Sequence, residues 1–155
     1  MQTQYQGSAP FMYPFSRALF KELAPIIATE PVNPSAGSNR ELVLRACELT
    51  LERLADDYRY FPDPERFLFE QIRMYFPITE QLLVYNTVKK HLSLATEVVK
   101  AYAAKGYKPD GTRVQCRATT RRSTACIRNV VLGSEYCPSH QHLAEPHFTE
   151  APHAA

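Results

Sequence analysis

Three of the four cysteines lie in one short stretch near the C-terminus, and this cluster limits the possible folds of that stretch more than any other feature. Cys116, Cys126 and Cys137 are followed by His140, which gives the spacing Cys-x9-Cys-x10-Cys-x2-His. A ligand pair two residues apart can bind one side of a tetrahedral ion, and the two preceding cysteines can complete its shell. Three thiolates and one imidazole leave no open position for water or substrate. The pattern therefore predicts one structural Zn²⁺ per chain.

The segment around these ligands has too few large apolar residues for a core of its own: Val114, Ile127, Val130, Val131, Leu132 and Tyr136. We therefore expect residues 107–143 to form a small zinc-binding module, of which residues 114–142 are unfolded without zinc. Disulfides are the competing interpretation, but three cysteines leave one unpaired, and Cys47 lies on an apolar helical stripe as a small buried side chain. A Cys–His nucleophile would require orienting neighbours that this segment lacks.

Prolines divide the N-terminal half into short segments, because a proline is excluded from the interior of a helix. We predict a short helix with Ser16 as its N-cap, ending near Ala24 or, if Pro25 only bends it, near Ala28. A Pro-rich linker over 30–37 follows.

Capping signals then place three longer helices. Ser38 begins a Ser-x-x-Glu capping box, followed by an apolar stripe that indicates a helix of about twenty residues. Asp63 and a proline at the first helical position begin the next helix. Thr79 is the predicted N-cap of the longest helix, over 79–104, and Gly106 follows its end.

Apolar residues three and four positions apart form a heptad seam along this last helix: Tyr85, Val88, Leu92, Ala95, Val99 and Tyr102. The seam packs either against the other helices of the chain or against a second copy, so a homodimer through 79–104 stays open. His91 lies off the seam and is expected at the surface.

Basic residues concentrate around the cysteines. From Lys100 to Leu143 there are eight lysines and arginines against Asp110 and Glu135, which gives +6, although the whole chain carries only +2. Such an asymmetry indicates a segment that meets an anionic partner, or else a solvated basic face.

The ligand spacing resembles that of the WRC (Trp-Arg-Cys) domain of plant growth-regulating factors, and of other short Cys3His zinc segments that end in Tyr-Cys-x2-His. The resemblance covers about 25 residues, from Cys116 to His140. Thr124-Ala125 stands where the family has Trp-Arg, and 141–145 where it has a basic run. The resemblance implies that Cys116, Cys126, Cys137 and His140 bind zinc, and that such a unit binds DNA.

Two functions follow from these features. In the first, the protein is a nucleic-acid-binding or transcription-linked regulator that presents Arg117, Arg121, Arg122 and Arg128 to phosphates. In the second, it is a protein-interaction adaptor in which zinc is purely structural. An enzyme is not expected, because the carboxylates of Asp56 or Asp57 with Glu80 lack any accompanying catalytic pattern.

The expected architecture is mainly α: a bundle-like domain of three to four helices followed by a small C-terminal Cys3His zinc module. We expect an N-terminal arm over 1–37 with one short helix, a helical domain over 38–106, the zinc module over 107–143 and a disordered tail over 144–155. The longest apolar runs are far short of the ~20 residues of a membrane span, and the N-terminal residues do not read as a secretory signal. An intracellular protein is therefore expected, cytoplasmic, or nuclear if the source is eukaryotic.

Overall fold

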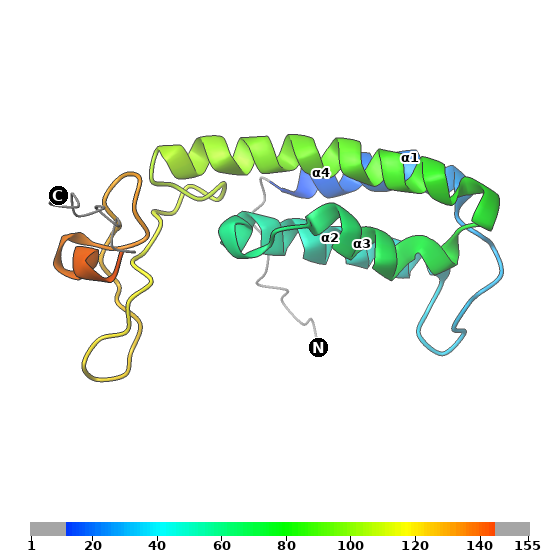
Figure 1. The fold of residues 1–155 in the computed structure, drawn as a ribbon. Helices are drawn as coiled ribbons and strands as arrows, with labels where there is room; N and C mark the ends of the chain where they lie inside the picture. The colour runs from blue at the N-terminus through cyan, green and yellow to red at the C-terminus, as the bar shows by residue number, and fades with distance from the viewer. Residues whose placement is uncertain (1–11, 145–155) are drawn as a thin grey trace, which may run out of the picture.

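The structure is a computed structural model that describes residues 12–144 and is mainly helical, as predicted (Figure 1). Within this range the α-helices are α1 (Tyr13–Leu23), α2 (Asn39–Asp57), α3 (Pro64–Ile72) and α4 (Gln81–Ala104). Short 3-10 turns extend or connect them, and a last one, η5 (Pro138–Leu143), lies in the C-terminal segment. None of the described helices is both long and apolar enough to cross a membrane. The tail predicted over 144–155 falls almost entirely outside the described residues.

Two of the predicted helix starts are confirmed. The Ser38 hydroxyl accepts a hydrogen bond from the Glu41 N–H (3.3 Å), and the Glu41 carboxylate accepts one from the Ser38 N–H (3.1 Å), which completes the capping box of α2. At α3 the Asp63 carboxylate accepts from the Arg66 N–H, and Pro64 is the first helical residue. Both caps satisfy N–H groups that have no partner inside the helix.

The prediction that Ser16 caps the first helix is wrong. α1 begins at Tyr13 with Met12 as its N-cap, so Ser16 lies in its first turn. Its side chain is buried and donates back to the Tyr13 carbonyl (2.9 Å). Pro14, in the first turn of α1, is the signal that a helix starts before Ser16.

The predicted cap at Thr79 is also wrong, although the helix itself is confirmed. A 3-10 turn over Ile78–Glu80 precedes α4, and no side chain caps its N-terminus.

Helix α4 ends at Ala104, as predicted. There the Gly106 N–H donates to the Ala103 carbonyl (2.9 Å) and the Tyr107 N–H to the Tyr102 carbonyl (3.1 Å). This pair of bonds is a Schellman motif, which requires the positive φ (80°) of Gly106.

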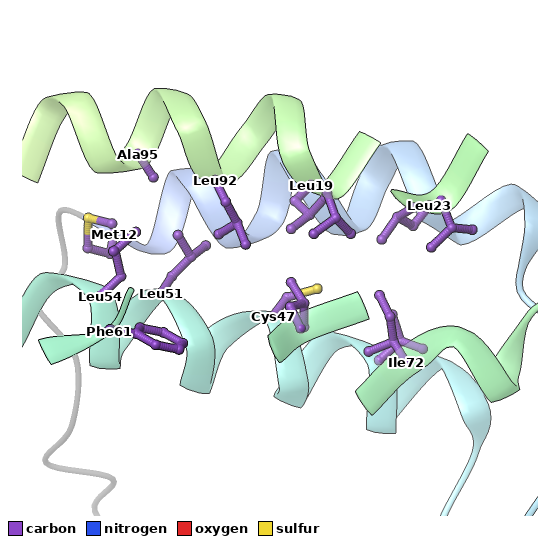
Figure 2. Packing of buried hydrophobic residues seen from close by; sticks show 14 of the residues in the cluster. Met12, Leu19, Leu23, Cys47, Leu51, Leu54, Phe61, Ile72, Leu92 and Ala95 are labelled. Carbon is purple, nitrogen blue, oxygen red and sulfur yellow. The ribbon is translucent and has the colours of Figure 1, made fainter. Parts of the chain in front are cut away.

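All four helices contribute to one apolar core (Figure 2). In this view side chains of α1 and α4 point toward side chains of α2 and α3, for example Leu19 and Leu92 toward Cys47 and Ile72. The largest side chains with almost no exposed surface are Met12, Leu19, Leu23, Leu51, Leu54, Leu68, Ile72 and Leu92. Helix α1, placed in the N-terminal arm by the sequence, therefore packs as one of the helices of the bundle.

The heptad seam of α4 faces this core. Val88, Leu92, Ala95 and Val99 are buried, whereas Tyr85 and Tyr102 at its two ends are half-buried. Val84, one residue before Tyr85, takes the first buried position. Packing within one chain is thus sufficient to explain the seam, and the homodimer stays a prediction.

Candidate metal centre

The segment after α4 folds back on itself as a narrow hairpin. Isolated antiparallel bridges join Tyr107 to Arg113, Gln115 to Asn129 and Thr119 to Ala125. The Cys116 N–H donates to the Arg128 carbonyl, and the Cys126 N–H to the Ala118 carbonyl, each at 2.8 Å. Neighbouring side chains of an extended chain point to opposite faces. This register therefore brings Cys116 and Cys126 to one buried face and leaves Arg117 and Ile127 exposed.

The other two predicted ligands come from the last turn. Cys137 precedes η5, and the His140 N–H donates to the Cys137 carbonyl (3.0 Å), so the backbone turns back toward the cysteines. The His140 Nδ1 lies 3.2 Å from the Cys137 Sγ and 3.5 Å from the Cys116 Sγ. One ligand atom each from Cys116, Cys126, Cys137 and His140 lies within 4.8 Å of all the others.

The donor set and its size fit a tetrahedral metal ion. With Zn–S bonds of about 2.3 Å and a Zn–N bond of about 2.0 Å, the edges of the coordination tetrahedron are about 3.5–3.8 Å. The distances between sulfur and nitrogen in the cluster are close to these edges. Soft thiolates in a tetrahedral arrangement favour zinc over oxygen-preferring cations. The Cys3His group could therefore hold a metal ion with a closed shell, while His142 lies beyond it on the same turn.

Local electrostatics favour a thiolate at one ligand. Burial opposes ionisation of Cys116, but backbone hydrogen bonds from Cys137 and Ala118, with His140, outweigh it and lower the pKa of its thiol to about 7. Burial in the bundle has the opposite effect on Cys47, where it raises the pKa to about 12. Cys47 therefore stays a neutral thiol in the core, as its place on the apolar stripe predicts.

The module buries little besides its ligands. Its buried cluster consists of Cys116, Ala118, Cys126 and Cys137, with Tyr136 packed against it. Ile127 and Leu132 are 80% and 68% exposed. Such a small cluster offsets little of the conformational entropy lost on folding, so a metal ion would have to supply most of the stability of the module.

Salt bridges and one aromatic contact hold the module against the end of α2. Arg117 binds the Asp57 carboxylate (3.0 Å), and its guanidinium lies 3.6 Å from the centre of the Tyr60 ring. Lys108 pairs with Asp56. Glu135 accepts from the Tyr60 hydroxyl (2.8 Å) and pairs with Arg59 (3.3 Å). An open cleft of about 460 Å³ lies beside these contacts, and the paired charges form part of its walls.

This interface was not predicted, but α2 carries a signal for it. Negative charges at the C-terminus of a helix are unfavourable, because the carbonyl ends already carry partial negative charge. Asp56 and Asp57 occupy the last two positions of α2, and this placement indicates basic partners from elsewhere in the chain. Lys108 and Arg117 are those partners, so the structure engages both aspartates in ion pairs.

The four predicted nucleic-acid residues divide into two groups. Arg117 is held by Asp57 and Tyr60, and Arg128 donates to the Ser139 hydroxyl (2.7 Å). Arg121 and Arg122 instead lie at the tip of the hairpin, exposed, and pair with no carboxylate in residues 12–144.

His91, expected at the surface, is half-buried, and its ring pairs with the Glu22 carboxylate. Hydrogen bonds from His91 and Lys90 lower the pKa of Glu22.

Comparison of the chain with protein-family models, with curated proteins and with solved structures finds no match in any of the three. The resemblance to the WRC domain therefore depends on the ligand spacing alone.

Proposed function

We propose that this chain is a nucleic-acid-binding regulator in which a structural zinc ion fixes a basic hairpin, and in which zinc has no catalytic role. The zinc would be held by Cys116, Cys126, Cys137 and His140, whose donor atoms already lie together. The helical bundle would act as the base on which the hairpin is held. Arg121 and Arg122 would bind backbone phosphates.

One observation carries this proposal: the hairpin is strongly basic, and the arginines at its tip are exposed. Residues 111–134 contain five arginines and no carboxylate. Only Arg117 has a carboxylate partner within the described residues. A guanidinium binds phosphate through two parallel hydrogen bonds, so exposed arginines on a fixed loop suit a phosphate backbone. In Figure 1 the loop that carries the tip extends away from the helices and toward solvent.

Binding to duplex DNA should therefore weaken with salt in proportion to the arginines involved. With Arg113, Arg121, Arg122 and Arg128 engaged, the slope of log affinity against log salt should be about −3 to −4. Replacing both Arg121 and Arg122 by alanine should make the slope about 2 units less steep, because two phosphate contacts are lost. Fluorescence anisotropy titrations between about 50 and 200 mM salt measure this slope, on protein whose zinc content has been counted.

The matched control removes two charges from the bundle instead. Arg66 on α3 and Lys89 on α4 are exposed and lie outside the hairpin. The double variant Arg66→Ala, Lys89→Ala should keep the slope of the unmodified protein. If both double variants made the slope less steep by the same amount, only net charge would matter, which contradicts a binding site on the hairpin.

An apolar surface favours the adaptor as a second candidate. Met74, Ile78 and Leu82, at the corner between α3 and α4, are 54%, 84% and 72% exposed. This corner lies at the end of the bundle opposite the module (Figure 1). A protein partner bound there would be held by apolar contacts. Its affinity should be nearly independent of salt and unchanged in the Arg121→Ala, Arg122→Ala variant, which distinguishes it from nucleic-acid binding.

A further inference from the structure

We propose that the hairpin tip recognises the shape of duplex DNA by inserting Arg121 and Arg122 into a narrow, A·T-rich minor groove. This inference rests on the proposed nucleic-acid binding and specifies which nucleic acid and which groove. It depends on the conformation of the tip, on the side chains beside the two arginines, and on the contacts that hold the rest of the hairpin.

The tip is a tight loop that places the two arginines at its outermost point. The Ser123 N–H donates to the Thr120 carbonyl (2.9 Å), and the Thr120 N–H donates to the Thr124 carbonyl (2.7 Å). Ser123 has φ of 58°, the left-handed conformation that closes three-residue hairpin loops. The hydroxyls of Thr120 and Thr124 also bond to each other (2.8 Å). Hydrogen bonds between the residues before and after Arg121 and Arg122 therefore hold the backbone of the tip in place.

The side chains around the two arginines lack the groups that read adenine and cytosine in the major groove. Apart from the two arginines, all residues of 119–125 are threonine, serine or alanine. The loop therefore has no side-chain amide or carboxylate. Adenine and cytosine are read in the major groove by such groups. Hydroxyls instead suit contacts to the phosphates on either side of a groove. The tip therefore presents two guanidiniums flanked by phosphate-binding groups.

The rest of the hairpin is not free to lie in a major groove. Arg117, on its exposed face, is held by Asp57 and Tyr60 of the bundle. Here the charges of Lys108 and Arg117 are balanced by Asp56 and Asp57, so this part of the hairpin offers phosphates little attraction. The tip is therefore the part of the hairpin that would enter a groove, while the exposed Arg113 and Arg128 would contact phosphates beside it. A minor groove about 6 Å wide admits side chains but not a ribbon, and where A-tracts narrow it further its negative potential attracts arginine.

The experiment uses three duplexes of equal length, bound to the full chain at one low salt concentration. The first carries an A-tract, the second is G·C-rich, and the third has inosine in place of guanine in the second. Inosine keeps the major-groove acceptors of guanine but removes the N2 amino group that projects into the minor groove. We expect the A-tract and inosine duplexes to bind about tenfold more tightly than the G·C duplex.

The variant Arg121→Lys, Arg122→Lys separates shape recognition from charge. Lysine keeps the charge but is more strongly hydrated than arginine, so it loses more on entering a groove. This variant should keep the salt dependence of binding and lose most of the A-tract preference. Such a result, with the inosine result above, would support the inference.

Other outcomes overturn it in distinguishable ways. Equal binding to the three duplexes, still weakened in Arg121→Ala, Arg122→Ala, would overturn the groove assignment and leave the proposed function standing. A preference of the G·C over the inosine duplex, or of single strands or RNA over all three, would overturn it in the same way. The absence of salt-dependent binding to any nucleic acid would overturn both.

Discussion

Replacing Cys137 by serine is expected to remove the metal and unfold the module while the helical bundle stays folded. Cys137 is the most buried of the four ligands and is the start of the turn that positions His140. Structural zinc contributes about 10–16 kcal/mol of apparent binding free energy in small zinc domains. The module has only a small buried cluster to replace this contribution. The metal content should therefore fall from about one ion per chain to near zero.

Three readouts follow this change. Mass spectrometry under native conditions counts the metal, amide hydrogen exchange reports the module, and circular dichroism reports the helices. Exchange protection should be lost over 107–143 and retained in α1 to α4, because the bundle has its own core. Cys126→Ser should behave in the same way.

Cys47→Ala is the matched control for the loss of a thiol. Cys47 is buried among the helices with its pKa raised to about 12 by burial, so it is not a thiolate ligand. The variant should keep the full metal content. Equal loss of metal in Cys47→Ala and Cys137→Ser would contradict the assignment of the ligands.

The second large effect is expected in the bundle. Leu92 is fully buried on the inner face of α4 and points into the space between the helices (Figure 2). Leu92→Ala should lower the free energy of unfolding by about 2–5 kcal/mol, because it removes buried apolar surface and leaves a cavity. Urea denaturation followed by circular dichroism at 222 nm measures this change.

Leu94 provides the control two residues away on the same helix. Its side chain is 57% exposed, so Leu94→Ala should change the free energy of unfolding by no more than about 0.5 kcal/mol. A large effect of Leu94→Ala that depends on protein concentration would show that the outer face of α4 is covered by a second copy. Such a homodimer would use the outer face of 79–104 and not the heptad seam, which packs within the chain.

Local signals in the sequence predicted the fold where they act through hydrogen bonds over a few residues. The Ser38 capping box, the Asp63 cap and the glycine stop at Gly106 all form as expected. Each of these needs only neighbours three to five residues away. The apolar stripe of α4 predicted its buried face for a similar reason, since helical geometry alone fixes which side chains share that face.

The two wrong caps show where such signals compete. Serine favours both an N-cap and a bond back to a carbonyl of the preceding turn, and Ser16 makes the second. The start of α1 is set instead by a proline in its first turn. At α4, a 3-10 turn after Pro77 moves the α-helical start past Thr79 to Gln81.

The candidate site was predictable in its ligands but not in its surroundings. The spacing of Cys116, Cys126, Cys137 and His140 is one that four ligands of a single ion can have, and the structure brings these side chains together. The partner of Arg117 is Asp57, sixty residues away, and no spacing rule relates the two. As a result Arg117, which the sequence placed among the phosphate contacts, is held in the interface with the bundle.

This interface suggests why the bundle and the module share one chain. Exposed ion pairs contribute little stability one by one. Together with the Tyr60 contacts to Arg117 and Glu135, however, they fix the direction in which the hairpin points. A loop with two free arginines binds more tightly when its orientation is set in advance, because less conformational entropy is lost on binding. If the proposed function holds, the bundle would thus aid binding without contacting the nucleic acid.

The measurement that tests the closed Cys3His centre most directly is X-ray absorption at the zinc edge, on purified full-length protein whose metal has been counted. We predict one zinc per chain with three sulfur ligands at about 2.3 Å and one nitrogen at about 2.0 Å. A shell that contains water or carboxylate oxygen would contradict a closed structural site, and protein that folds its module without any bound metal would contradict the centre itself.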